Sequence, residues 1–317
     1  MYRRLQKRLE TAGLCERIKE TCKGYLEWVF NLKPEAASSA NVRIDGEIIK
    51  VGYSSTRVPN NNPTLMPYHI IKATEYLRVF HDLEDLEFVC KGLGNLCQEW
   101  FLQLNQTKNR RTPTWQHFQG SDVPYYRLGD HVWVWKALKG IEEVLNRLES
   151  HRQPCIERNI KRFTVRNEVF NKRMLSVTRS ANETRFLLHS RDTVLYYGAL
   201  WDSFEDQEDL LHEMLEIQTR HDDSLCDEVE WTNPLRYGLA LLWSLQGYRL
   251  AWGKSSGQMV NRAKKFLLAS SYPTGLFPGY LDAFKKAYIF ETENDYDIYF
   301  HTGFEIAYIL LKSLDLN

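Results

Sequence analysis

The sequence lacks a surplus of charge of either sign. Its 317 residues include 41 lysines and arginines and 41 aspartates and glutamates. An even balance produces no overall field that would draw the protein to nucleic acid or to an anionic membrane. We therefore expect no nucleic-acid partner, and any binding site has to be sought in local groups of residues.

Long apolar runs are also missing. No stretch of the chain approaches the roughly 20 apolar residues that a transmembrane helix requires. The first twenty residues, MYRRLQKRLETAGLCERIKE, have no apolar centre of the kind found in secretory signals and instead have the pattern of an amphipathic helix. We expect a protein without a membrane span, located in the cytoplasm.

The sequence also lacks motifs of paired cysteines and motifs that bind nucleotides. The six cysteines form no CxxC pair and no Cys/His pattern with the spacing of a zinc site. Free thiols in a reducing compartment are the simplest account of them. The chain has no Walker A or GxGxxG pattern, no GxSxG and no HExxH. These absences exclude the enzyme classes that those motifs mark.

Helical periodicity is abundant. Apolar residues recur at spacings of three and four across 66–83 and 130–150, as an amphipathic helix requires. The segments 235–248 and 303–314 are apolar on nearly all sides, which is typical of helices inside a domain. A β-hairpin is predicted only where Asp45-Gly46 separates two short β-prone runs.

These patterns predict an all-α fold, with many antiparallel helices around a central cavity and a small N-terminal β-hairpin. We expect residues 1–60 to form a helix and a hairpin that pack on the core. Residues 61–317 would form an all-helical domain, a single structural unit.

Polar residues at helical spacing mark two of the predicted helices. A capping-box pattern at Ser180 and Glu183 predicts a helix start. One face of this helix would carry a base, an imidazole, an acid and a phenol, namely Arg185, His189, Asp192 and Tyr196. Near the end of the chain, Glu305 follows His301 by four residues in an apolar setting. A buried glutamate needs a partner, so Glu305 either pairs with His301 or an arginine or faces a wet cavity. Both stripes also fit an ordinary surface or a structural ion network.

An acidic stretch, QTRHDDSLCDEVEW (218–231), follows a helix whose acids form a solvated face. His221-Asp222-Asp223 lies where that helix is predicted to end, before a new helix start at Asn233-Pro234. Carboxylates there face the negative end of the helix dipole at a cost of roughly 0.3–1 kcal/mol each. Their presence favours a bound cation over an exposed acidic turn. Carboxylate oxygens suit Mg²⁺ when phosphate oxygens complete its coordination.

Five segments carry a family resemblance, namely RLGDHVWVWKAL (127–138), ETRFLLHSRDT (183–193), EWTNPLRYGLA (230–240), GLFPGYLDAFKK (275–286) and YFHTGFEIAYILL (299–311). Together they resemble the non-canonical fungal sesquiterpene cyclases of the humulene-synthase type. The resemblance covers roughly the last two-thirds of the chain. Similar motifs occur in larger fungal proteins described as carbohydrate-active, so the set is more specific for a superfamily than for a reaction.

The resemblance implies a lyase of fungal secondary metabolism that ionises farnesyl diphosphate with Mg²⁺ and closes a macrocycle such as humulene. It also implies a lysine near the diphosphate, four residues after a residue that controls product geometry. Leu281 and Lys285 have this spacing, and so do Leu250 and Lys254. We prefer Lys285 as the catalytic residue because it follows a Gly/Pro-rich loop.

On this interpretation the metal ligands are Asp222 and Asp223, helped by His221 or Asp192. The residues expected to bind the substrate are Arg185 and Arg236 at the diphosphate, and Trp133, Trp135, Tyr197, Trp231 and Leu281 around the hydrocarbon. The acidic motif departs from the usual DDxxD, because Cys226 stands where its last acid would be. A smaller or differently liganded metal cluster is therefore expected.

Two alternatives remain open. A carbohydrate-active enzyme on an (α/α) toroid would use two carboxylates, such as Asp192 and Glu305, without a metal. A helical interaction protein without activity would use the polar stripes only structurally. The sequence leaves both a monomer and a homodimer open.

Overall fold

The computed structural model describes residues 13–37, 42–48, 66–106, 115–117, 125–147, 160–186, 193–204, 207–224, 233–246, 256–272, 277–279, 281, 305–311 and 313. For part of the helical residues, including 218–224, it describes the backbone alone. Within these ranges the protein is predominantly helical with a few short antiparallel strands, as the all-α prediction required in outline. None of the described helices combines the length and the apolar character needed to cross a membrane.

Contacts divide the chain into two compact units. We call residues 2–165 and 176–185 the N-terminal unit, and residues 1, 166–175 and 186–317 the C-terminal unit. The division at residue 60 that the sequence suggested stays a prediction.

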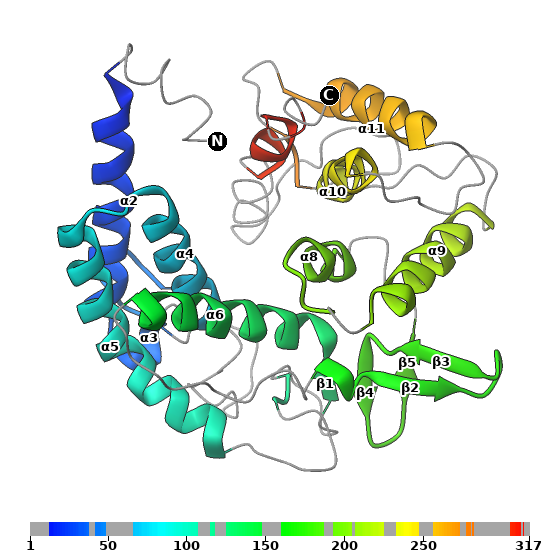
Figure 1. Ribbon diagram of the computed structural model, residues 1–317, viewed down its shortest axis with the longest axis horizontal. Helices are drawn as coiled ribbons and strands as arrows, with labels where there is room; N and C mark the ends of the chain where they lie inside the picture. Colours follow the sequence, from blue (N-terminus) through cyan, green and yellow to red (C-terminus); the bar gives the residue numbers. More distant parts are fainter. Residues whose placement is uncertain are drawn as a thin grey trace. The chain divides into compact units, whose positions relative to one another are not determined.

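The helices described in the N-terminal unit are α2 (Leu14–Phe30), α3 (Pro34–Ala37), α4 (Met66–Val79), α5 (Leu83–Gln106) and α6 (Leu128–Arg147). Helix α4 packs against α2, α5 and α6 (Figure 1). Ile70 and Leu77 of α4, Trp100 of α5 and Val134 of α6 are buried in a shared apolar core. The three- and four-residue periodicity seen in the sequence therefore corresponds to the buried faces of these helices.

A buried ion cluster links three of these helices. Asp85, at the start of α5, is 1 % exposed. It accepts a hydrogen bond of 2.7 Å from Tyr76 and lies 2.8 Å from Lys19 Nζ. Burial alone would raise the pKa of Asp85, but the contacts with Lys19 and Tyr76 outweigh it and hold the pKa below its usual range. The cluster is structural, since both partners satisfy the carboxylate within the fold.

Short strands form a three-stranded antiparallel sheet in the N-terminal unit, in the order β1 (Tyr125–Arg127), β4 (Thr178–Ser180), β5 (Thr184–Arg185). The helix predicted to start at Ser180 is wrong. Ser180 Oγ instead accepts hydrogen bonds from the backbone N–H groups of Asn182 and Glu183 in the turn between β4 and β5. A serine oxygen can satisfy N–H groups of a turn as well as those of a first helical turn, and here the turn forms.

The predicted N-terminal hairpin is confirmed for residues 42–48. Val42 and Ile48 form an antiparallel bridge. Between them the backbone N–H of Arg43 donates to the carbonyl of Glu47 over 2.8 Å. Gly46 has φ 85°, a left-handed conformation that glycine adopts without strain.

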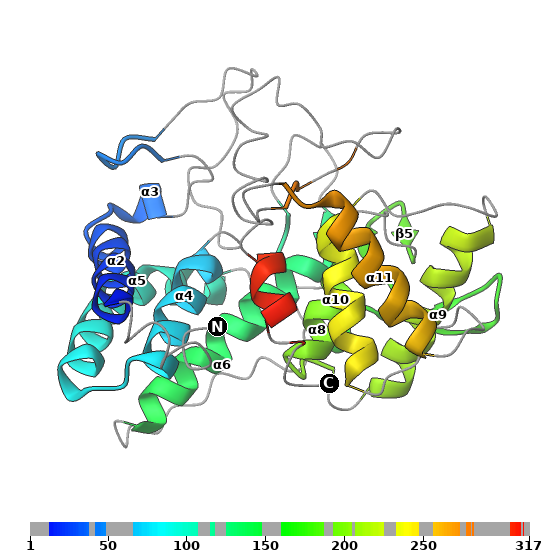
Figure 2. The ribbon, with the colours of Figure 1, turned by 90° about the horizontal axis from the view of Figure 1, so that it is seen from above.

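The C-terminal unit contains β3 (Lys172–Leu175), which pairs with β2 (Thr164–Asn167), and the helices α8 (Val194–Leu200), α9 (Glu208–Ser224), α10 (Pro234–Leu245) and α11 (Ser256–Ser270). Residues 305–311 are also helical. Helix α10 packs against α8 and α11, and α11 lies alongside it in Figure 2. The rings of Tyr237 and Phe266 stack across α10 and α11 with their centres 4.0 Å apart.

Helix α10 is buried on every side from Pro234 to Ser244, which confirms the prediction of an internal helix there. The Asn233 side chain accepts a hydrogen bond of 3.0 Å from the backbone N–H of Leu235. Pro234 occupies the first turn, so the predicted cap and proline start are also confirmed. These contacts fix where α10 begins, and thereby place Arg236 in its first turn.

Candidate functional site

The predicted metal ligands lie at the end of a helix. Helix α9 ends at Ser224, so His221, Asp222 and Asp223 occupy its last turn, as expected. Their side chains lie outside the described residues, and so does the whole of Asp192. Among the side chains that the structure describes, no group of three or more His, Cys, Asp or Glu could hold a metal ion. The Mg²⁺ site stays a prediction.

Arg236 is the most deeply buried of the predicted substrate-binding residues that the structure describes. It is 1 % exposed and lies in the first turn of α10, a helix whose other buried residues are mostly apolar. A guanidinium keeps its charge at all ordinary pH values. A buried charge is stable only beside groups of opposite charge, and the N-terminus of a helix adds a partial positive charge of its own. This position suits a negatively charged partner, either a carboxylate or a phosphate group.

Glu305 has a partner that the sequence did not predict. The Tyr197 hydroxyl on α8 donates a hydrogen bond to Glu305 Oε1. Burial raises the pKa of Glu305, and the hydrogen bond from Tyr197 opposes part of that rise. The alternatives foreseen for Glu305 were His301, an arginine or a cavity. His301 lies outside the described residues, and the phenol is the contact that the structure places there.

Tyr197 is held from two directions. Its hydroxyl is fixed by Glu305, and its ring lies against Trp201 with ring centres 5.0 Å apart. The residue is 7 % exposed. Leu281, also in the C-terminal unit, is 2 % exposed. Tyr197 and Leu281 are therefore both buried in this unit.

The two tryptophans of α6 belong to the N-terminal unit. Trp135 is 5 % exposed, and the Trp133 ring lies 4.6 Å from the ring of Tyr68, centre to centre. Residues two apart on a helix do not face the same side. At most one of the two tryptophans could therefore line any single cavity. Trp231 and Lys285 lie outside the described residues.

Arg185 is in strand β5 of the N-terminal unit, with its side chain 66 % exposed and paired with Glu183 over 2.7 Å. It borders an open polar hollow of about 410 Å³. The other lining residues are Tyr125, Arg127, Thr178, Ser180, Asn182 and Glu183. The predicted stripe that joined Arg185 to Asp192 on one helix is wrong, because Arg185 is in a strand and α8 begins only at Val194.

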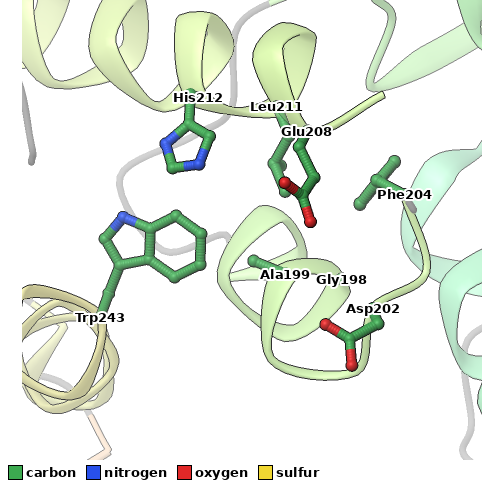
Figure 3. A pocket seen from close by; sticks show the side chains of 8 residues that line it. All are labelled: Gly198, Ala199, Asp202, Phe204, Glu208, Leu211, His212 and Trp243. Atoms are coloured by element: carbon green, nitrogen blue, oxygen red, sulfur yellow. The ribbon is translucent and has the colours of Figure 1, made fainter. Parts of the chain in front are cut away.

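A second cavity, in the C-terminal unit, was not foreseen. Its volume is about 20 Å³, and its lining residues are Gly198, Ala199, Asp202, Phe204, Glu208, Leu211, His212 and Trp243 (Figure 3). A Cβ at Gly198 would lie 2.1 Å from a ring carbon of Phe204, so glycine is required for this close packing. A space of this size holds one water molecule. It is far too small for a fifteen-carbon substrate.

The sequence held one signal for this cavity. Glu208 and His212 are four residues apart and so share a face of α9. Asp202 joins them from the loop after α8, with φ 57°. Figure 3 shows the His212 ring against Trp243 and the two carboxylates on the other side.

Comparison with models of known protein families, with curated proteins and with solved structures finds no match for this chain.

Proposed function

We propose that the protein is a Mg²⁺-dependent sesquiterpene cyclase that ionises farnesyl diphosphate and closes a macrocycle such as humulene. The observation that supports this proposal is the buried Arg236 in the first turn of α10, the helix that follows the acidic end of α9 in the sequence. The last turn of α9 bears Asp222 and Asp223, and the first turn of α10 bears the buried Arg236. Carboxylate oxygens such as those of Asp222 and Asp223 can coordinate a metal ion, and the guanidinium of Arg236 can donate hydrogen bonds to a diphosphate.

In this proposal Asp222 and Asp223 hold Mg²⁺, with His221 or Asp192 beside them. Bound there, the ion would supply positive charge next to the diphosphate oxygens. Arg236 and Lys285, both in the C-terminal unit, would donate charge-assisted hydrogen bonds to the same group. The C–O bond breaks, the diphosphate leaves with the bonding electrons, and the positive charges of the protein stabilise it as it leaves. The first product is an allylic cation.

The cation needs an apolar, water-free cavity lined by aromatic faces. Tyr197 suits this role because Glu305 and Trp201 fix its ring. Leu281 and Trp231, which belong to the same unit as Tyr197, would complete the lining of the cavity. Loss of a proton, with the released diphosphate as a base, would end the reaction.

Incubation with farnesyl diphosphate tests the proposal directly. We expect a volatile macrocyclic hydrocarbon and free diphosphate in the presence of Mg²⁺, and neither product after chelation of the metal with EDTA. Gas chromatography with mass spectrometry measures the hydrocarbon, and a phosphate assay measures the leaving group. Absence of Mg²⁺-dependent turnover would refute the cyclase proposal.

One observation favours a second candidate, the carbohydrate-active enzyme. Glu305 is a half-buried carboxyl whose pKa is raised by burial, and a general acid for glycoside cleavage requires a raised pKa. The second carboxylate would be Asp192. This candidate needs neither Mg²⁺ nor a positive group at the leaving oxygen.

Glu305→Gln separates the two candidates. A glycosidase would lose hydrolysis of aryl glycosides by on the order of a hundredfold or more, because its proton donor is gone. A cyclase would still release diphosphate, since the amide oxygen still accepts a hydrogen bond from Tyr197. Glu168→Gln, which changes an exposed glutamate, is the matched control and should alter neither activity. Initial rates on both substrates decide between the candidates.

A further inference from the structure

The β2–β3 hairpin ends in two exposed apolar side chains. Val169 is 87 % exposed and Phe170 is 59 % exposed, in the turn formed by residues 168–171. Turns usually carry Gly, Pro, Asn, Asp or Ser, because these residues suit turn conformations or hydrogen-bond their own backbone. Valine and phenylalanine contribute neither property, so their presence at the tip needs another explanation.

The turn is held in one conformation by its polar residues. The Asn167 side chain, on a residue 8 % exposed, accepts hydrogen bonds from the backbone N–H groups of Val169 and Phe170 over 2.9 and 3.2 Å. Asn171 has φ 49°, a left-handed conformation that asparagine tolerates, and its side chain accepts a hydrogen bond from Arg166. The apolar pair is therefore displayed on a preorganised loop, which lowers the entropy cost of binding.

The other end of the hairpin is anchored in the C-terminal unit. Met174 and Leu175 of β3 are 1 % and 0 % exposed, and β3 packs against α9. Lys172 forms an ion pair with Glu213 of α9. The hairpin is thus buried at its base and apolar but exposed at its tip, which is visible in Figure 1 as the loop joining β2 to β3.

The hairpin also has a local surplus of positive charge. Residues 166–173 read RNEVFNKR, with three lysines and arginines and one acid, Glu168, in a chain whose overall charge is balanced. Arg166 and Arg173 are exposed. Lys172 forms an ion pair with Glu213, so its charge is already partnered within the protein. The net charge beside the apolar tip is therefore positive.

We propose that this hairpin tip docks on an anionic phospholipid surface, with Val169 and Phe170 entering the boundary between head groups and acyl chains. Arg173 and its basic neighbours would contact the lipid phosphates. Two apolar side chains beside basic ones match that boundary, because it offers hydrocarbon and negative charge within a few ångströms. A second copy of the chain would bring the same positive tip, and the two would repel. A nucleic acid could contact the lysines and arginines of the hairpin, but it would give the exposed Val169 no apolar partner.

Co-sedimentation with vesicles tests the proposal, independently of any catalytic assay. We expect the protein to bind phosphatidylcholine vesicles that contain phosphatidylserine, to bind pure phosphatidylcholine vesicles much less, and to be released by high salt. The double variant Val169→Ser/Phe170→Ser should bind on the order of tenfold more weakly, because it removes the apolar contact. Arg173→Gln should weaken binding to the anionic vesicles alone, by about fivefold.

Leu268→Ser is the matched control, since Leu268 of α11 is 75 % exposed in the same unit. It should bind vesicles as the unaltered protein does. Equal binding to both kinds of vesicle, or an equal loss in Leu268→Ser, would overturn the proposal. So would a tip variant that lowers the molecular mass in solution without changing vesicle binding, because the tip would then join copies of the chain. All these positions are exposed, so circular dichroism should show unchanged folds.

Discussion

Asp223→Asn is expected to abolish Mg²⁺-dependent release of diphosphate from farnesyl diphosphate and, at the same time, to stabilise the metal-free protein slightly. The loss of activity follows if Asp223 is a metal ligand. The stabilisation follows from its position in the last turn of α9, where a carboxylate faces the negative end of the dipole. Removing that charge should raise the free energy of unfolding by about 0.3–1 kcal/mol. Activity and thermal unfolding without metal measure the two effects.

Asp209→Asn provides the opposite control in the same helix. Asp209 is an exposed acid in the first turn of α9, where the dipole favours a negative charge. The substitution should lower the free energy of unfolding by about 0.3–1 kcal/mol and leave turnover unchanged. Retained turnover in Asp223→Asn would contradict the metal assignment. A loss of activity accompanied by a loss of stability would show that Asp223 has a structural role.

Lowering the pH from 7 to 5 is expected to reduce the free energy of unfolding by about 4 kcal/mol, because the fold holds two histidines of the N-terminal unit, the buried His131 and the half-buried His69, in neutral form. Burial lowers the pKa of His131 to about 4, and burial together with the charge of Lys72 lowers the pKa of His69 to about 4. The ordinary value for both is 6.5.

The contacts of His131 show why its protonated form is disfavoured. Its Nδ1 lies 2.8 Å from the carbonyl oxygen of Arg127, and its Nε2 lies 3.4 Å from the backbone nitrogen of Trp115. A neutral ring that carries its proton on Nδ1 satisfies both contacts. A second proton on Nε2 would point at the N–H group of Trp115. The imidazolium therefore forms mainly after unfolding.

The folded protein binds fewer protons than the unfolded one at these two sites. Their stabilisation is complete above about pH 6.5 and is lost as the pH falls toward 4. Denaturant unfolding at pH 7, 6 and 5 measures the effect. His131→Asn should be less stable at pH 7 but should lose only about 2 kcal/mol over the same interval. Substitution of the exposed His81 by Gln is the control and should leave the full dependence. A flat profile for the unaltered protein would contradict the prediction.

Several helices could be predicted from the sequence because their signals are local. The periodicity of 66–83 and 130–150 corresponds to α4 and α6, and Asn233-Pro234 fixed the start of α10. The end of α9 at the acidic pair followed from the same reasoning. Each of these signals depends on neighbours within one or two helical turns, which a single sequence displays in full.

The strands could not be found in the same way. Strands β4 and β5 have three and two residues, too few for an alternating pattern to emerge. The stability of β4 depends on pairing with β1, which lies about fifty residues earlier in the chain, and β5 pairs in turn with β4. Ser180 misled the prediction because its hydroxyl serves a turn and a helix start equally well.

The candidate site was predicted only in part. Burial of Arg236, Tyr197 and Leu281 was a reasonable expectation for residues within apolar segments. The hydrogen bond between Tyr197 and Glu305 joins residues 108 positions apart, so no spacing rule could reveal it. The cavity beside His212 combines α8, α9 and α10 and depends on how they pack. Local patterns predict which side chains are inside, but tertiary packing decides which of them meet.

The complete burial of α10 has a consequence for how the chain folds as it is synthesised. Helix α10 emerges from the ribosome before α11 and before the 305–311 helix, whose Ile306 and Ile309 lie beside Gly238. Until those partners are made, α10 has only its contacts with α8, and the rest of this apolar helix stays exposed to water. The C-terminal unit should therefore fold late and cooperatively, after the 305–311 helix has left the ribosome. A chain truncated before residue 305 should accumulate in aggregates, even though every residue of α10 itself is intact.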